Sequence, residues 1–105
     1  MGVALDSIVS AGCIISGGRV NLSVLGPGVR VHSYCEIERS ILMPNVEVGR
    51  HSVIRNAILD TGAILPEHSR VGLDANEDRA NGYVVTDGGV TVVPGPSRGM
   101  VRAAH

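Results

Sequence analysis

Three of the four histidines are the side chains best suited to chemistry in this sequence, and two of them share a spacing that recurs along the chain. His68 follows His51 at a step of 17, and His32 precedes them both. A catalytic zinc ion commonly takes three protein ligands such as histidine and leaves a fourth position open. A single histidine can instead be the general base of an acyltransferase. Two histidines with a distant third match a zinc site poorly, so the spacing favours a ladder of surface rings.

Arginines form a second candidate set, because guanidinium groups bind phosphate well. Several of them have a glutamate one such step before or after in the chain, which favours solvated ion pairs over a phosphate site. The same spacing puts Arg19 beside Glu36. The five arginines considered are Arg30, Arg39, Arg50, Arg55 and Arg70.

This spacing belongs to a repeat of the whole chain, in which aliphatic residues recur at intervals of six, six and five. A helical face would recur every three or four residues, and an amphipathic strand every second residue. A six-residue period is typical of a parallel β-helix, where each hexapeptide forms one face of a triangular coil. The predicted core columns are Ile8, Leu25, Leu42, Leu59; Ile14, Val31, Val48, Leu65; and Val20, Ile37, Ile54, Val71.

Small residues precede these core positions by two, where the corners of a narrow prism leave little room. The predicted corner columns are Gly12, Val29, Val46, Ala63; Gly18, Cys35, Ser52, Ser69; and Ser23, Ser40, Ala57. We therefore expect Cys35 to be a buried corner residue. Cys13 falls in a mixed column that we expect to face outward, and no disulfide between the two is expected.

The pattern stops after the fourth coil, because another step of 17 reaches Asn76, Gly82 and Gly88. We predict an all-β chain with four coils of about 17 residues over residues 1–73. A cap over 74–93 would hold a polar helical turn and a β-hairpin around the Asp87-Gly88-Gly89 turn. Residues 94–105 would form a loose tail. The repeat begins close to Met1, so we expect another domain or subunit to cover the first coil, or the chain to be an excised piece.

Length and charge narrow the class of protein. A chain of 105 residues is expected to form one domain. A net charge of −1 argues against a nucleic-acid or membrane-surface binder. The sequence shows no apolar run long enough to span a bilayer and no signal peptide, so a cytoplasmic location is expected.

Several stretches closely resemble the carboxy-terminal domain of bacterial glucose-1-phosphate adenylyltransferase (ADP-glucose pyrophosphorylase), and the resemblance covers about residues 6–93. They are Asp6–Gly17, Ser23–Leu25, Val29–Cys35, Leu42–Arg50, Ile58–Asp60, Ile64–Glu67 and Val71–Asp78. The resemblance implies a left-handed β-helix. It also implies a parent enzyme that uses Mg²⁺ to make ADP-glucose and pyrophosphate from ATP and glucose 1-phosphate for glycogen biosynthesis.

In that family an amino-terminal nucleotidyltransferase domain with a glycine-rich phosphate loop performs catalysis, and this sequence has no such motif. The resemblance therefore implies an oligomerisation and allosteric part that is not catalytic alone and holds no cofactor itself. Its partners would be the catalytic domain and further copies, a tetramer in the family. The alternatives are a stand-alone hexapeptide-repeat acyltransferase, another β-helix enzyme, or a structural fragment without activity.

The resemblance also implies an allosteric pocket for a phosphorylated metabolite such as AMP or a sugar bisphosphate. Thr61 stands where an arginine can follow an Ile-Ile-Asp-like motif, and Asn45 stands where an acidic residue can follow the proline of a Leu-x-Pro motif. Arg98 and Arg102 are the basic residues of the terminal segment. The implied anion-binding set is Asn45, Arg50, Thr61, Arg98 and Arg102.

Overall fold

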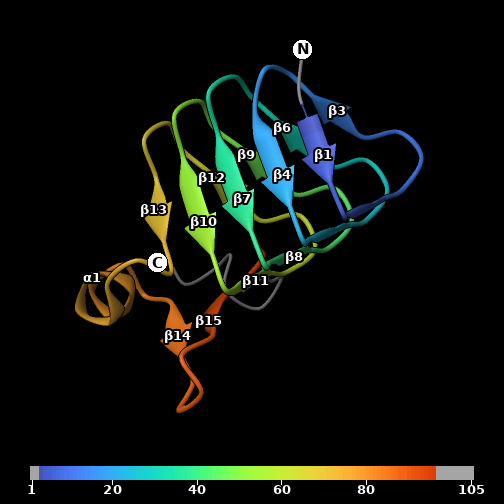
Figure 1. Cartoon of the computed structure of the whole chain (residues 1–105). Helices are drawn as coiled ribbons and strands as arrows, with labels where there is room; N and C mark the ends of the chain where they lie inside the picture. Colours follow the sequence, from blue (N-terminus) through green and yellow to red (C-terminus); the bar gives the residue numbers. More distant parts are fainter. Residues whose placement is uncertain (1–2, 97–105) are drawn as a thin grey trace.

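The chain winds into a triangular prism of stacked coils in the computed structural model, which describes residues 3–96. Each coil adds one short strand to each of the three faces of the prism, and strands of neighbouring coils pair in parallel (Figure 1). Face 1 holds β1 (Val3–Leu5), β4 (Arg19–Asn21), β7 (Glu36–Glu38), β10 (Val53–Arg55) and β13 (Arg70–Val71). Face 2 holds β2 (Ile8–Val9), β5 (Val24–Leu25), β8 (Ile41–Leu42), β11 (Ala57–Leu59), β15 (Thr91–Val93) and β14 (Val84–Val85). Face 3 holds β3 (Ile14–Ile15), β6 (Arg30–Val31), β9 (Glu47–Val48) and β12 (Ile64–Leu65).

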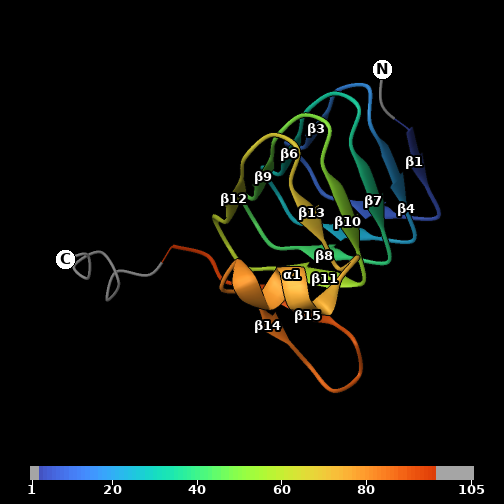
Figure 2. The ribbon, with the colours of Figure 1, turned by 90° about the vertical axis from the view of Figure 1, so that its left-hand side faces the viewer.

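The structure confirms the predicted left-handed parallel β-helix, which Figure 2 shows from its carboxy-terminal end. In coils 2 to 4 the register between neighbouring strands is one full repeat, as expected. Val31 lies beside Val48, which lies beside Leu65. From β4 to β13, each strand points one large aliphatic side chain inward, and these residues are buried together in one core: Val20, Leu25, Val31, Ile37, Leu42, Val48, Ile54, Leu59, Leu65 and Val71.

The first coil departs from the predicted columns by one residue. Val9 lies beside Leu25 and Ile15 beside Val31, so this coil is one residue shorter than the full repeat. The predicted core residues Ile8 and Ile14 instead point outward and are 66% and 56% exposed. The shortening falls between β3 and β4, where Gly17 and Gly18 make the corner tighter than the corresponding Tyr34-Cys35 corner of the next coil. Gly17 has a φ of 72°, a conformation that costs glycine little.

The same offset overturns two predictions about corner residues. Cys13, and not Gly12, occupies the inward corner beneath Val29, and Cys13 packs half-buried against the core. Its thiol donates a hydrogen bond to the Gly26 carbonyl oxygen at 3.1 Å. The expectation that Cys13 faces outward is therefore wrong. Cys35 is buried as predicted, and both cysteines are free thiols.

Buried serines connect the coils at the corner between faces 1 and 2. The Ser40 backbone N–H donates to Ser23 Oγ at 3.1 Å, and the Ala57 N–H donates to Ser40 Oγ at 3.2 Å. Each serine hydroxyl also donates to a carbonyl oxygen two residues earlier. The small corner residues therefore fill the prism and also satisfy backbone groups that water cannot reach.

A helix and a hairpin close the carboxy-terminal end, as the polar segment and turn predicted. Helix α1 (Ala75–Ala80) is capped at its amino-terminal end by Asp74, whose carboxylate accepts the Asn76 N–H at 2.9 Å. β14 pairs antiparallel with β15, and β15 in turn pairs parallel with β11, so that Val93 lies beside Leu59. The hairpin thus adds to face 2. Most of the predicted tail, from residue 97 onward, lies outside the described residues. No helix among residues 3–96 has the length and apolar character needed to cross a membrane.

Candidate functional site

A ladder of three aromatic rings runs along the corner between faces 3 and 1. Tyr34 and His51 stack with ring centroids 4.9 Å apart, and His51 and His68 stack at 5.0 Å with an interplanar angle of 5°. The stacking of the two histidines confirms the prediction from their spacing. Tyr34 was missed, although it precedes His51 by one full repeat and could have been found by the same rule.

The backbone explains why the rings align. Each of the three residues has a positive φ between 61° and 62°. The N–H of each donates to a carbonyl of the coil below, at 2.8 Å between His68 and Arg50 and at 3.0 Å between His51 and Ser33. Identical corners stacked one coil apart must project their side chains in parallel, so the ladder follows from the repeat.

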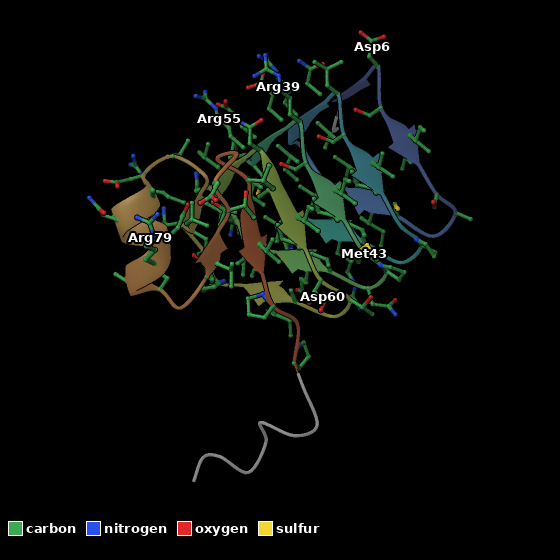
Figure 3. All side chains as sticks on the ribbon, turned by 90° about the horizontal axis from the view of Figure 1, so that it is seen from below. Asp6, Arg39, Met43, Arg55, Asp60 and Arg79 are labelled. Carbon is green, nitrogen blue, oxygen red and sulfur yellow. The ribbon has the colours of Figure 1, made fainter. Side chains whose placement is uncertain are left out.

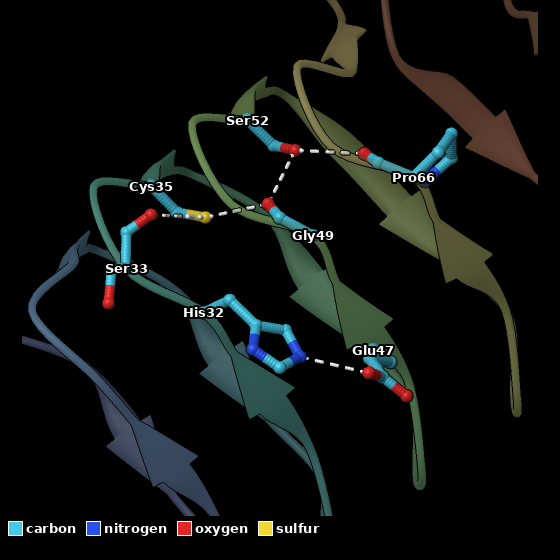
Figure 4. A network of polar contacts seen from close by, with 7 residues as sticks. All are labelled: His32, Ser33, Cys35, Glu47, Gly49, Ser52 and Pro66. Atoms are coloured by element: carbon cyan, nitrogen blue, oxygen red, sulfur yellow. Dashed lines mark hydrogen bonds and ion pairs between the residues drawn. The ribbon is translucent and has the colours of Figure 1, made fainter.

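His32 forms a close pair with Glu47 on face 3 (Figure 4). Its Nε2 atom lies 2.8 Å from Glu47 Oε2, and the two side chains are 41% and 38% exposed. A histidine oriented by a carboxylate can act as a general base in principle. This pair lies on an open cleft with a volume of about 370 Å³ that is also lined by Arg50 and Glu67. Because two carboxylates and one arginine line the cleft, its charge does not favour an anion.

The described residues do not bring the three histidines together. His32 pairs with Glu47, whereas His51 and His68 stack in the ladder. Within residues 3–96, no cluster of three or more His, Cys, Asp or Glu side chains could hold a metal ion. The histidines of this part of the chain therefore serve a surface pair and a ring ladder.

Beneath the ladder, Cys35 and Ser52 share a carbonyl acceptor. The Cys35 thiol donates to the Gly49 oxygen at 3.0 Å, and the Ser52 hydroxyl donates to the same oxygen at 2.7 Å (Figure 4). Burial raises the pKa of the Cys35 thiol above its ordinary value, and backbone hydrogen bonds from Ser52 and His51 offset part of this rise. A buried thiol of raised pKa makes a poor nucleophile, so Cys35 is a packing residue.

This raised pKa predicts a loss of stability at alkaline pH. The unfolded thiol has an ordinary pKa of 9.0, and the pKa of the folded thiol is higher. The stabilisation is therefore complete below the unfolded pKa and is lost as pH rises through the folded pKa. The free energy of unfolding from urea titrations under reducing conditions should fall between pH 8 and 10 by up to about 1.4 kcal/mol per pH unit. Cys35→Ala should lose this dependence, and an equal slope in the variant would contradict the assignment. Burial and the nearby Asp78 carboxylate also raise the pKa of Tyr83. Tyr83 therefore lowers the free energy of unfolding only at higher pH.

The implied anion-binding residues occupy different corners of the prism. Asn45 and Thr61 lie on the corner between faces 2 and 3, where the neighbouring Gly62 N–H donates to the Pro44 oxygen at 3.0 Å. Arg50 lies on the corner between faces 3 and 1, beside the ring ladder. Arg98 and Arg102 lie outside the described residues. The structure thus brings Asn45 and Thr61 to one corner and leaves Arg50 apart from them.

Charged residues on face 1 occur in the predicted register. Arg19 lies beside Glu36, and Glu38 lies beside Arg55, with Arg55 Nε 3.6 Å from Glu38 Oε1. On face 3, Arg30 lies beside Glu47, whose carboxylate contacts His32. These exposed charges therefore have neighbours of opposite sign, as the solvated ion-pair interpretation requires.

Comparison with known proteins shows which family this fold belongs to. The GlmU-like C-terminal hexapeptide family matches residues 1–93. The glucose-1-phosphate adenylyltransferase of Parafrankia sp. (strain EAN1pec) is 54% identical over 93 residues, which are 89% of this chain and 22% of that protein. The proteins of the same name from Rhodopirellula baltica and Koribacter versatilis are each 53% identical, over 88% and 89% of this chain and 21% and 22% of their own length. The chain therefore spans about a fifth of the length of these relatives.

Proposed function

Because the chain belongs to the GlmU-like C-terminal hexapeptide family, we propose that it is the carboxy-terminal β-helix part of a glucose-1-phosphate adenylyltransferase. The carrying observation is an identity of 54% to a protein of that name, confined to 22% of the protein's length. The chemistry of the parent enzyme, which transfers the adenylyl group of ATP to glucose 1-phosphate and releases pyrophosphate, then belongs to the other four fifths. ATP and Mg²⁺ would bind there, and no step of the reaction is assigned to the residues of this chain.

The role left for this chain is mechanical and regulatory. A prism held by parallel ladders on three faces is a stiff element on which a larger domain can rest. We propose that it supports a homo-oligomer, for which the resemblance implies a tetramer. We also propose that a phosphorylated effector contacts the corner of Asn45 and Thr61, because these two of the implied residues share one corner.

The experiment is a chimera in which this chain replaces the matching segment of the Parafrankia enzyme. ADP-glucose formation is measured for the isolated chain, the chimera, and the Parafrankia enzyme without that segment. We expect no turnover from the chain alone, activity of the chimera within about tenfold of the natural enzyme, and a larger loss in the shortened enzyme. Turnover by the isolated chain, or a chimera no better than the shortened enzyme, would overturn the proposal.

A further inference from the structure

Face 2 carries an unbroken column of aliphatic side chains on its outer surface. Strand register places these residues side by side, from the first coil to the hairpin: Ile8, Val24, Ile41, Ile58, Val92 and Val84. Ile8, Val24, Ile41 and Val84 are exposed, and Ile58 and Val92 are half-buried. At about 4.8 Å per strand the column extends over about 24 Å.

The outer surfaces of the other two faces differ in kind. The outward positions of face 1 include Arg19, Glu36, Glu38 and Arg55, and the corresponding column of face 3 is interrupted by the Arg30 and Glu47 pair. Strands exposed to water normally alternate apolar residues inside with polar residues outside. Face 2 has aliphatic residues on both sides, which is the pattern of a strand covered on both sides.

Charged residues lie along the margins of the column. Figure 3 looks onto face 2, with Asp6, Arg39 and Arg55 along one margin and Met43 and Asp60 along the other. Met43 adds a partly exposed apolar side chain beside the column. An apolar centre with a polar rim is the composition of a protein interface, and monomers seldom expose large contiguous apolar patches.

We propose that face 2 is the surface on which the remaining four fifths of the polypeptide packs, an inference that rests on the proposed function. The relatives carry this additional length, since the matched segment is 22% of the Parafrankia protein. Covalent connection gives such a neighbour a high effective concentration, so a flat aliphatic contact suffices to hold it. The matching surface must be aliphatic and free of charge, because the column offers no partner for a buried charge. A second copy of the chain would lack the advantage of connection.

The test uses the chimera with a protease site at the junction and a matched pair of variants. Ile41→Lys places a charge in the middle of the column, between Val24 and Ile58. Ile64→Lys places the same charge on face 3, where Ile64 is 70% exposed and lies beside Glu47. After cleavage, sedimentation velocity over a dilution series measures the dissociation constant between the chain and the rest of the protein. Circular dichroism checks that each variant is folded.

We expect Ile41→Lys to weaken the association by about tenfold or more, and Ile64→Lys to leave it within about twofold of the unchanged protein. If Ile41→Lys does not fold, Val24→Thr adds one hydroxyl to the same column and should weaken the association by about threefold. Equal dissociation constants for the Ile41 and Ile64 variants would overturn the inference. So would a self-association of the isolated chain that Ile41→Lys abolishes while binding to the rest of the protein is unchanged.

The two proposals fail separately. An active chimera whose association is insensitive to Ile41→Lys removes the role of face 2 and leaves the proposed function standing. A chimera without ADP-glucose formation, but with an Ile41-dependent association, removes the proposed function and leaves face 2 as a docking surface for that polypeptide.

Discussion

Replacing Val48 with aspartate should abolish the cooperative thermal unfolding transition of the chain. Val48 is fully buried on face 3 in the third coil, between Val31 and Leu65. A carboxylate there would lie in the hydrophobic core between two aliphatic residues. An uncompensated buried charge costs about 3–5 kcal/mol or more. A domain of this size is stable by only about 5–15 kcal/mol, so the loss is comparable to the whole. Circular dichroism during heating measures the effect.

Two controls separate the charge from other effects of the substitution. Val48→Ala removes methyl groups without adding charge and should cost less, about 2–3 kcal/mol. Ile64→Asp adds the same carboxylate on the exposed side of the adjacent strand and should cost under about 1 kcal/mol. A Val48→Asp chain that melts near the unchanged protein would contradict the burial of Val48.

Replacing Asp78 with alanine should produce the second large loss. The Asp78 carboxylate is 1% exposed, and its Oδ2 accepts the Thr91 hydroxyl at 2.7 Å and the Gly72 N–H at 3.0 Å. It therefore joins α1 to the segment after β13 and to β15. Without it, the buried Thr91 hydroxyl and the half-buried Gly72 N–H lose their acceptor. Each buried donor left unpaired costs about 1–3 kcal/mol, and we expect a total loss of about 3 kcal/mol in urea unfolding.

A double-mutant cycle with Thr91→Val tests whether the carboxylate acts through this contact. Valine matches the shape of threonine without the hydroxyl, so the single variant should lose one hydrogen bond, worth about 1 kcal/mol. In the double variant no unpaired Thr91 hydroxyl remains, and the combined loss should fall short of the sum by at least about 0.5 kcal/mol. Additive losses would show that Asp78 does not stabilise the end through Thr91.

The sequence determined the fold because its period left no other regular structure. The six-residue spacing excluded a helix, and glutamates and arginines one coil apart indicated the register that the strands adopt. The first coil could not be placed correctly from the pattern. Ile8-Val9 and Ile14-Ile15 are adjacent aliphatic pairs, so either residue of each pair satisfies the core rule. Only the tighter Gly17-Gly18 corner decides between them.

The candidate site was predictable only where it follows the repeat. The His51–His68 stack follows from spacing alone, and Tyr34 would have followed from the same rule. His32 and Glu47 are 15 residues apart, not one full repeat, so the repeat does not predict their contact. That contact depends on how the two side chains rotate. Asp78 lies outside the repeat, so its burial against Thr91 depends on how the helix and hairpin return to the prism.

The one-residue difference between the first coil and the others bears on how such a chain changes length during evolution. Its strands keep their hydrogen-bonded neighbours although one residue is missing, because a glycine corner absorbs the deletion. A deletion inside a strand would instead exchange inward and outward side chains, since these alternate. Insertions and deletions in this architecture should therefore accumulate at corners or arrive as whole coils. The number of coils can change by duplication while every surviving coil keeps its contacts.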